Sequence, residues 1–419
     1  MKNISIIVQA SSTSWSGGKD LCMNQMEGRP VLYHTIKELL EYFSDNIANL
    51  WLVAPEFDRG GLDFVKTFFP NGVLQTYYGY DASPLQRMIN VTQNLKDEDF
   101  VLRVNGINFC VDTESAKENL ILAQASSYDC IRFPDDFPAL FTSDVYRVGA
   151  LRRMYSTHQD VERKYFVHPK YYLSKSPNYK CAISEPDKSK YSDEYLLSIR
   201  QRYKNAMAAK RIEVDISKAI KSGDSIQLHY ELASTFLKDS RFVLDLACGS
   251  GFGTNILSAG AERVIGVDND REMIDQANNL YRTNGLEFLA ADVLDLPYDS
   301  NSVDAVVAFE IIEHVAPKDL LREISRVLKP GGVMCLSTPQ NSLGHIPTTS
   351  DHLREFSLDE IRVIVGELFR LEKIIGIKQG SIFFSDDPVG SNTFMVAKKP
   401  MGRDAAGVSR AEGWRREVE

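Results

Sequence analysis

The chain has 419 residues, more than one typical domain holds, and its apolar fraction of 43% is ordinary for a protein that buries real cores. The net charge of −9 disfavours a general surface for nucleic acid or anionic membrane, since both bind clusters of Lys and Arg. No stretch approaches the about 18 consecutive apolar residues of a membrane helix, and the N-terminal apolar run is too short for a signal peptide, so we expect a cytoplasmic protein without membrane insertion.

The first 190 residues alternate apolar, strand-like runs with helical patterns. The strand-like runs read "ISIIVQA", "NLWLVAP" and "FVLRVNG". Helices are expected around Pro30–Phe43 and over Thr113–Ala125, the second with Asp112 as its N-cap. This alternation indicates a parallel sheet between two layers of helices, a three-layer α/β domain over residues 1–190.

A polar, helix-favouring segment follows and predicts a helical linker over residues 191–225. A second α/β pattern begins at "RFVLDLACGSG" and predicts another three-layer domain over residues 226–400. The last residues, 401–419, are rich in Gly, Ala and Arg, and we expect them to form a disordered tail.

Six cysteines are scattered along the chain: Cys22, Cys110, Cys130, Cys181, Cys248 and Cys335. They form no CxxC pair and no zinc-ligand spacing with histidine. We therefore expect most of them to be small buried residues in a reducing cytoplasm, and we expect no metal site. Cys248 in particular is expected to pack beneath a loop rather than to act as a nucleophile.

The second half of the chain contains a glycine-rich loop, "ACGSGFG", which follows a predicted buried strand and precedes a predicted helix. A helix N-terminus with exposed N–H groups suits an anionic or polar ligand. The next strand ends in Asp268, about twenty residues after the first glycine, where a dinucleotide-binding unit has its ribose-binding carboxylate. These features alone would also fit an NAD-dependent oxidoreductase.

Three further features distinguish a dinucleotide from other cofactors as the ligand of this loop. Asp245 lies within the first strand, where a buried carboxylate suits a ligand with an amino group better than a pyrophosphate. Asp292 ends a third strand and could accept a hydrogen bond from an adenine amino group. A fourth strand leads to Phe309, Glu310 and His314, and is followed by the helix "DLLREISRVL", the turn "KPGG" and the strand "VMCLSTP".

Taken in order, the segments Asp245–Gly253, Asp268, Asp292, "FEIIEHV" and "RVLKPGG…LSTP" resemble the motifs of class I S-adenosylmethionine-dependent methyltransferases. The resemblance implies a Rossmann-like fold, with S-adenosyl-L-methionine as cofactor. In such a site the glycine loop packs against the methionine part, Asp268 holds the ribose and Asp292 reads the adenine. The residues that the resemblance assigns to cofactor binding are Asp245, Ala247, Gly249, Gly251, Gly253, Asp268, Asn269, Asp292, Val293 and Phe309.

The sulfonium methyl group is already activated, so the enzyme must align an acceptor and remove a proton if the acceptor is a hydroxyl. His314 and His352 are candidate bases, because a neutral imidazole titrates in the useful range. His314 could instead cap the end of its strand or line the cofactor pocket, and His352 could serve only to hold a loop. Glu310 and Glu313 could orient a base or a sugar hydroxyl, or serve only the structure.

The N-terminal half carries a second, looser resemblance. The stretch "VQASSTSWSGGKDLCMNQMEGRPVLYHTI" combines a strand, a Ser/Gly loop ending in Lys19 and a helix start. It resembles the cytidylyltransferases that make CMP-sugar acids and spore-coat polysaccharide precursors. The family's loop arginine is absent, however, and its metal-binding aspartate corresponds to Ile107, which cannot ligate Mg²⁺. This implies a degenerate domain that keeps the fold without transferase activity. It could bind a nucleotide such as CTP or a CMP-sugar, present the acceptor, or mediate assembly.

The segment "HLREFSLDEI" (His352–Ile361) is similar to one common in methyltransferases of glycan and lipid-linked substrates. We therefore expect O-methylation of a sugar, nucleotide sugar or surface-glycan intermediate. One alternative is a bifunctional enzyme that activates and methylates a sugar acid. Another makes the N-terminal domain a non-catalytic binding or oligomerisation module. The expected partner is a small-molecule or glycan acceptor, not nucleic acid, and a homo-oligomer stays open.

Overall fold

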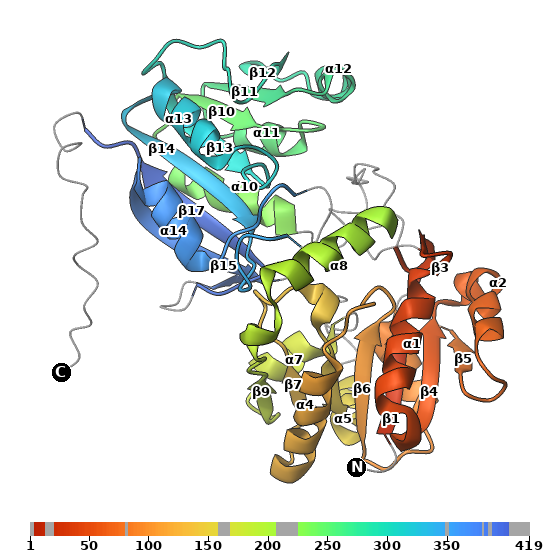
Figure 1. The fold of residues 1–419 in the computed structure, drawn as a ribbon. Helices are drawn as coiled ribbons and strands as arrows, with labels where there is room; N and C mark the ends of the chain where they lie inside the picture. Colours follow the sequence, from red (N-terminus) through yellow and green to blue (C-terminus); the bar gives the residue numbers. More distant parts are fainter. Residues whose placement is uncertain are drawn as a thin grey trace, which may run out of the picture. The chain divides into compact units, whose positions relative to one another are not determined.

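The computed structural model describes residues 4–12, 21–79, 83–157, 168–206, 225–347, 352–378, 381–383 and 388–401. The chain divides into two compact units (Figure 1). Unit 1 comprises Met1–Asp224 with Ile346–Asp351, and unit 2 comprises Ser225–His345 with His352–Glu419. The tail expected at 401–419 lies, apart from Met401, outside the described residues.

The described part of unit 1 contains a seven-stranded sheet. In spatial order its strands are β5 (Gln75–Tyr78), β4 (Ile47–Ala54), β1 (Ile4–Gln9), β6 (Phe100–Asn105), β8 (Asp144–Arg147), β7 (Cys130–Arg132) and β9 (Cys181–Ile183). β8 runs antiparallel to both of its neighbours. The prediction of a wholly parallel sheet is therefore wrong at β8. Residues 133–143, which join β7 to β8, are too few for the crossover that a parallel pair needs.

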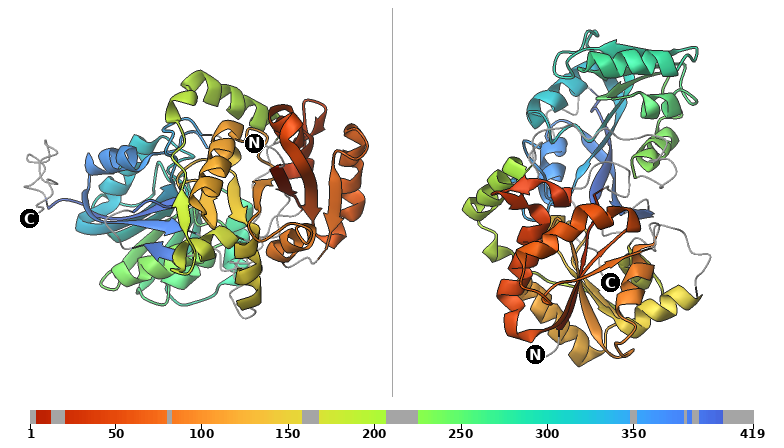
Figure 2. Two further views of the ribbon diagram at one scale, coloured as in Figure 1. Left: turned by 90° about the horizontal axis from the view of Figure 1, so that it is seen from below. Right: turned by 90° about the vertical axis from the view of Figure 1, so that its right-hand side faces the viewer.

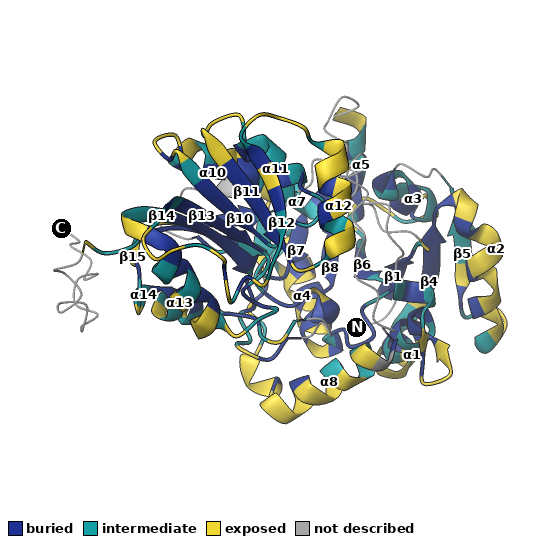
Figure 3. Ribbon diagram, turned by 90° about the horizontal axis from the view of Figure 1, so that it is seen from above, coloured by how far each residue is buried: buried dark blue, intermediate teal, exposed yellow. Residues whose placement is uncertain are grey.

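Helices cover both faces of this sheet, and Figure 3 shows buried strands between helices whose outer faces are exposed. Along β1, Ile6 and Val8 belong to one apolar core, and Ile7 belongs to the core on the other face. The alternation follows from the two-residue period of a strand and gives the three layers predicted for this region. The helices of unit 1 are α1 (Val31–Phe43), α2 (Arg59–Leu62), α3 (Pro84–Val91), α4 (Thr113–Ser126), α5 (Val148–Thr157), α7 (Pro169–Lys175) and α8 (Asp193–Ala206).

Asp112 caps α4, as predicted. Its Oδ1 accepts the Ser115 backbone N–H at 2.9 Å, and its Oδ2 accepts the Ser115 hydroxyl at 2.7 Å. The Tyr191 hydroxyl also donates to Oδ2, at 2.7 Å. The carboxylate therefore satisfies a helix N–H group and also fixes the chain that leads into α8.

Helix α8 lies inside the predicted linker at 191–225, but it belongs to unit 1. Leu196 and Ile199 are buried there, and Arg202 Nε donates to Glu27 Oε1 at 2.8 Å. The helix thus packs onto the first unit instead of forming a free connector, because its apolar side chains find a surface there. Residues 207–224 lie outside the described part of the chain.

Among the described residues, unit 2 contains an eight-stranded sheet. In spatial order its strands are β12 (Leu286–Ala290), β11 (Arg263–Asp268), β10 (Phe242–Leu246), β13 (Val303–Phe309), β14 (Leu328–Pro339), β17 (Asn392–Lys398), β15 (Arg370–Lys378) and β16 (Ser381–Phe383). The first five are parallel, and β17 is antiparallel to both of its neighbours. Strand order reverses between β10 and β13, which is where doubly wound sheets bind ligands.

Unit 2 also has three layers, and the views in Figure 2 show helices on both sides of its sheet. Leu244 of β10 shares a core with α13 and α14, whereas Val243 shares the opposite core with α10, α11 and α12. None of the described helices is long and apolar enough to cross a bilayer. The helices of unit 2 are α10 (Ser225–Phe236), α11 (Phe252–Leu257), α12 (Arg271–Leu280), α13 (Pro317–Val327) and α14 (Leu358–Gly366).

The "KPGG" segment differs from its prediction as a turn before a strand. β14 begins at Leu328, directly after α13, and runs through the segment without a break. Leu328 pairs with Val303, but Val333 pairs with Ala305, so the intervening residues form an irregularity in the strand. Gly331 has φ +79°, a conformation that glycine adopts without strain. The two glycines therefore allow a bulge inside β14.

His229 of α10 is buried in an aromatic cluster. Its ring is stacked on Phe394, with centroids 6.1 Å apart, and tilted against Phe309 at 5.5 Å. The residue is 1% exposed, and neither ring nitrogen has a hydrogen-bond partner. Burial lowers the pKa of His229 to about 3. The folded protein therefore holds a neutral imidazole whose polar atoms are desolvated without compensation.

We expect the His229→Leu variant to be more stable than the wild type, because it removes unsatisfied buried polar atoms. The free energy of opening at β10 and β13 should rise by about 1–3 kcal/mol. The difference should grow as pH falls from about 6.5 toward 3, because the unfolded chain then binds a proton that the folded chain excludes. Amide hydrogen exchange of the two strands measures this free energy. If the variant and the wild type showed equal protection at both pH 7 and pH 5, His229 would not be an uncompensated buried imidazole.

Candidate active site

The glycine loop after β10 turns sharply through left-handed conformations. Ala247, Gly249 and Gly251 have φ values of 57°, 53° and 79°. A Cβ on Gly251 would lie 2.5 Å from the Phe288 ring, so this glycine allows close packing on the sheet. A Cβ on Gly249 would meet nothing within 4 Å. Gly249 therefore presents its backbone to open space at the end of the strand, as a ligand cradle requires.

Asp245 anchors this loop from below. It is fully buried, and it accepts hydrogen bonds from Thr254 Oγ1 at 2.6 Å and from the Tyr230 hydroxyl at 3.2 Å. Burial raises the pKa of Asp245 to about 7, and the two hydrogen bonds offset part of that rise. Each carboxylate oxygen has one internal donor, so Asp245 ties β10 to the helices α10 and α11. Its contact with a ligand amino group stays a prediction.

Gly253 lies so close to Tyr230 that no side chain fits at this position. A Cβ there would lie 1.9 Å from the Tyr230 ring. Tyr230 in turn packs edge-on against Phe309, with ring centroids 5.0 Å apart. The third glycine of the motif therefore serves helix packing, while the first serves the ligand side.

Asp268 joins the glycine loop to the second strand. Its Oδ2 accepts the Gly249 N–H at 2.9 Å, and its Oδ1 accepts the Asp270 N–H at 2.9 Å. Each carboxylate oxygen can accept a further hydrogen bond, so the group keeps the capacity to bind hydroxyls. Asn269, the predicted neighbour, is exposed, and Asp270 caps α12 by accepting from Glu272 and Met273.

The remaining predicted cofactor residues divide into two groups. Asp292 is exposed two residues beyond the end of β12, and its Oδ1 accepts the Leu294 N–H at 2.9 Å. Val293 and Phe309 are buried and belong to the apolar cores of unit 2. The structure thus places Asp292 at the expected sheet edge and gives the two apolar side chains packing roles.

A cluster of carboxylates and imidazoles follows β13. Glu310 has φ 51°, and its Oε1 accepts the Ser337 hydroxyl at 2.8 Å. Its Oε2 accepts Asn392 Nδ2 at 2.9 Å. Because Ser337 lies in β14 and Asn392 begins β17, this carboxylate is fixed by the two following strands of the sheet.

Glu313 is the most deeply buried carboxylate of the cluster, with 1% of its surface exposed. Its Oε2 accepts the Thr338 hydroxyl at 3.0 Å, whereas its Oε1 has no hydrogen-bond partner. Burial, together with the charge of Glu310, raises the pKa of Glu313 well above its usual range. Burying a carboxylate oxygen without a hydrogen-bond partner costs free energy, and a bound ligand or a proton on that oxygen would reduce this cost.

The two predicted histidines converge beside Glu313. The His314 and His352 rings meet edge to face, with centroids 4.9 Å apart. His352 Nδ1 donates to Glu355 Oε1 at 2.8 Å, and Glu355 Oε2 accepts Asn341 Nδ2 at 2.8 Å. The structure therefore brings the three candidate catalytic residues, His314, His352 and Glu310, into one region after β13.

Backbone contacts hold the two segments of this cluster together. The Leu353 N–H donates to the Glu313 carbonyl at 2.8 Å, and the Arg354 N–H donates to it at 3.2 Å. Leu246 of β10 pairs in parallel with Ala308 of β13, so the two strands end at the same edge of the sheet. The glycine loop and the carboxylate–imidazole cluster therefore follow neighbouring strands at the switch point.

Several supporting residues were not singled out from the sequence: Tyr230, Thr254, Ser337, Thr338, Asn341, Glu355 and Asn392. Only Glu355 carried a local signal, since it lies three residues after His352. The others act through side chains that approach from separate strands and helices, which no sequence spacing reveals.

In unit 1, the predicted nucleotide loop at Gly17–Lys19 lies outside the described residues. Ser11 and Ser12, which precede it, are held by Asp58: the Ser11 hydroxyl donates to Oδ2 at 2.8 Å and the Ser12 N–H at 3.1 Å. Ile107 packs against the apolar core beside α1 and α4. The position aligned with the metal-binding aspartate thus serves packing.

A buried ion cluster in unit 1 was also not predicted. Arg103 of β6 and Lys170 of α7 both contact Asp144 of β8, at 3.2 and 3.1 Å. Arg103 Nε also donates to Gln9 Oε1 at 2.7 Å. These contacts cross-link three strands and a helix beneath the end of β1.

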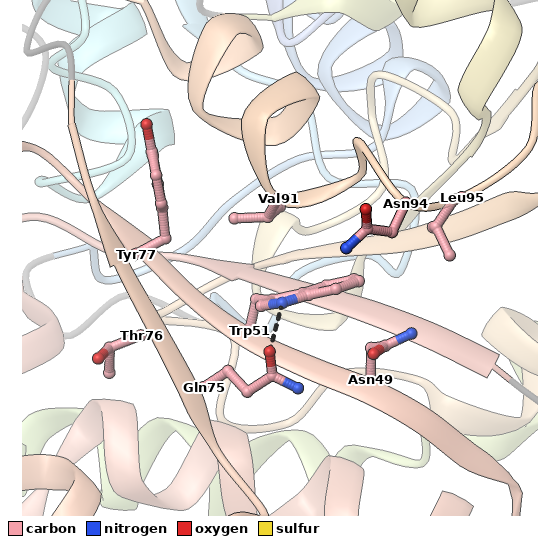
Figure 4. Close-up of a pocket in the computed structure, with 8 residues that line it drawn as sticks. All are labelled: Asn49, Trp51, Gln75, Thr76, Tyr77, Val91, Asn94 and Leu95. Atoms are coloured by element: carbon pink, nitrogen blue, oxygen red, sulfur yellow. Dashed lines mark hydrogen bonds between the residues drawn. The ribbon is translucent and has the colours of Figure 1, made fainter.

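A hollow of about 290 Å³ opens elsewhere on unit 1 (Figure 4). Trp51 of β4 lies within it, with Nε1 donating to Gln75 Oε1 of β5 at 3.0 Å. Its lining residues Asn49 and Gln75 lie toward the amino ends of these strands, whereas the predicted nucleotide loop follows the carboxyl end of β1. The hollow therefore does not coincide with the predicted nucleotide site.

Comparison with known proteins agrees with the geometry of unit 2. The family described as "Methyltransferase domain" matches residues 244–336. A probable S-adenosylmethionine-dependent methyltransferase of Mycolicibacterium smegmatis is 33% identical over 147 residues, which cover 34% of this chain and 56% of that protein. The match with a demethylmenaquinone methyltransferase of Clavibacter sepedonicus is 40% identical over 102 residues, 23% of this chain and 42% of that protein.

A fatty-acid O-methyltransferase of M. smegmatis is 33% identical over 112 residues, 26% of this chain and 40% of that protein. The chain thus spans about half the length of these relatives. Two of their names give an acceptor, and the two acceptors differ. The residues that the family matches, 244–336, contain the glycine loop, Asp268 and the start of the cluster after β13. Unit 2 therefore contains a class I S-adenosylmethionine-dependent methyltransferase domain.

Proposed function

We propose that this chain methylates an oxygen atom of a sugar, nucleotide sugar or surface-glycan intermediate. The observation that carries the proposal is the cluster of carboxylates and imidazoles at the edge of the sheet that also bears the glycine loop. A methyl donor held at one strand and an acceptor held at the next would meet at the switch point.

The residues of the loop fit the cofactor. Gly249 leaves open space for a ligand, and the Asp268 carboxylate has capacity for the ribose hydroxyls. Asp292 is exposed at the end of the third strand, where it would accept a hydrogen bond from the adenine. When bound, S-adenosyl-L-methionine supplies a methyl group activated by a sulfonium. Asp245 acts on the protein side, by fixing the loop to α10 and α11.

The polarity of the cluster favours a hydroxyl-rich acceptor. Glu310, Glu355, Asn341 and Asn392 present carboxylate and amide groups, which bind hydroxyls by donating or accepting hydrogen bonds. These groups are held by hydrogen bonds to one another and to Ser337 and His352, and each carboxylate oxygen can accept a further hydrogen bond from an acceptor hydroxyl. The similarity of "HLREFSLDEI" to a segment of glycan methyltransferases supports the same class of acceptor.

Methyl transfer to a hydroxyl requires the loss of one proton. The acceptor oxygen forms the new bond to carbon, the carbon–sulfur bond breaks, and its electron pair stays on sulfur. The hydroxyl proton leaves to a base, and His314 and His352 are the imidazoles at this edge.

For unit 1 we propose a degenerate, cytidylyltransferase-like domain that binds the nucleotide of a nucleotide-sugar acceptor. The parallel order β5-β4-β1-β6 supports a ligand at the end of β1, and Ile107 argues against a metal-dependent transferase. Incubation of the full chain with CTP, Mg²⁺ and sugar acids should release no pyrophosphate above background. Release that depends on Lys19 would overturn the degenerate assignment and favour a bifunctional enzyme.

The acceptor is tested by mass spectrometry. Glycan and nucleotide-sugar intermediates incubated with the chain and trideuteriomethyl-labelled S-adenosylmethionine should gain the labelled methyl group on oxygen. The Asp268→Ala variant serves as the low-activity control. Labelling of quinones or fatty acids, with sugars unlabelled, would contradict the proposed acceptor class.

Asp268 gives a quantitative test of the cofactor site. We expect Asp268→Ala to weaken binding of S-adenosylhomocysteine by about 1.5–3 kcal/mol, the range for hydrogen bonds to charged groups. Calorimetry measures the affinity. Asp275→Ala, which removes an exposed carboxylate from α12, is the matched control and should bind as the wild type does. Equal affinities for both variants would show that the loop binds something else.

The glycine motif gives a second test. Gly253→Ala forces its Cβ into the Tyr230 ring, so Tyr230 must move and release Asp245. We expect the affinity for S-adenosylhomocysteine to fall more than about tenfold, since a loss of about 1.4 kcal/mol of binding free energy is enough for a factor of ten. Gly260→Ala is the control, because its nearest neighbour would be 3.8 Å away. Wild-type affinity in Gly253→Ala would refute the packing role.

A further inference from the structure

We propose that Glu313, His314 and His352 bind one divalent first-row transition-metal ion. A carboxylate oxygen of Glu313 and one ring nitrogen of each histidine all lie within 4.8 Å of one another. Two imidazoles and one carboxylate that converge in this way form a set of metal ligands on one side of an ion. No zinc-type spacing is visible in the sequence, because the ligands come from the loop after β13 and from a separate segment before α14.

Glu313 supplies an independent reason for a cation. Its Oε1 is buried without a hydrogen-bond partner, while its Oε2 accepts the Thr338 hydroxyl. The charged groups that act on it most strongly are two further carboxylates, Glu310 and Glu355. A divalent cation would satisfy the unpartnered oxygen and offset the charge that these carboxylates concentrate.

His352 is oriented as a metal ligand. Its Nδ1–H donates to Glu355 Oε1 at 2.8 Å, so Nε2 is the nitrogen whose lone pair would bind the ion. Glu355 is itself fixed by Asn341 at 2.8 Å. A carboxylate on the second ring nitrogen is the usual support of a metal-bound histidine, since it sets the tautomer and raises the basicity of the ligand.

The ligand set indicates which ions fit. Imidazole nitrogens favour Zn²⁺, Fe²⁺, Co²⁺ and Ni²⁺, whereas Mg²⁺ prefers oxygen ligands alone. The carboxylate also suits Mn²⁺. We therefore infer a transition ion such as Mn²⁺, Co²⁺ or Zn²⁺. Three protein ligands leave coordination positions for an acceptor hydroxyl and a neighbouring oxygen.

This role rests on the proposed methyl transfer and changes the part played by the histidines. An ion held by these residues would make a bound hydroxyl more acidic, and the hydroxyl proton would be lost to water. The acceptor oxygen would form its bond to the methyl carbon as the carbon–sulfur bond breaks, with that electron pair staying on sulfur. His314 and His352 act as ligands that hold the ion, and an acceptor with two adjacent oxygens would chelate it.

The test uses the full chain after treatment with a chelator. Titration with Co²⁺, followed by calorimetry and visible absorption, should show one ion per chain. We expect His352→Ala and Glu313→Gln each to weaken binding at least about 100-fold, and Glu355→Gln to weaken it about 10–100-fold. His345→Ala, an exposed histidine of the same loop, should bind Co²⁺ as the wild type does.

Binding of S-adenosylhomocysteine by each variant serves as the folding control, since it depends on the neighbouring glycine loop. The proposal is overturned if the wild type binds no ion specifically, or if both ligand variants keep wild-type Co²⁺ affinity. Methylation of sugars that persists undiminished after chelation would overturn the catalytic role. Specific Co²⁺ binding without methylation of any sugar would support the metal site and overturn the acceptor class instead.

Discussion

The buried carboxylate of Asp245 is the constraint on which the methyltransferase domain depends. It accepts from Tyr230 on α10 and from Thr254 on α11, so one strand and two helices are tied at one point. Gly253 has room for no side chain because Tyr230 fills that space. The glycine loop starts from this anchored point, and Asp268 then fixes it to the next strand through the Gly249 N–H.

The carboxylate–imidazole cluster, which we propose to bind the acceptor, has a different construction. Its carboxylates follow β13, but the hydroxyls that position them come from β14: Ser337 holds Glu310 and Thr338 holds Glu313. The bulge at Gly331 lies earlier in that same strand and lets β14 start directly after α13 while staying in register at its end. The sheet therefore fixes the cluster as firmly as it fixes the cofactor loop.

Unit 1 shows how far a fold alone supports a function. Its layers, its parallel strands and the cap at Asp112 are those of the α/β domain that the sequence predicts. At the position expected for a metal-binding aspartate, however, the partly buried Ile107 packs against the apolar core. The antiparallel β8 instead contributes Asp144 to a buried pair with Arg103, which stabilises the sheet beneath the expected site.

The amino-acid sequence by itself determined the alternation of strands and helices, the glycine loop, and the positions of Asp268 and Asp292 at strand ends, because these depend on neighbours within a few residues. Tertiary structure decided the direction of β8, the packing of α8 on unit 1, and the internal partners of Asp245. It also decided the convergence of Glu313 and His314 with His352. Each of these depends on which segments the sheet order brings together, and hydrophobic periodicity carries no information about contacts between distant segments.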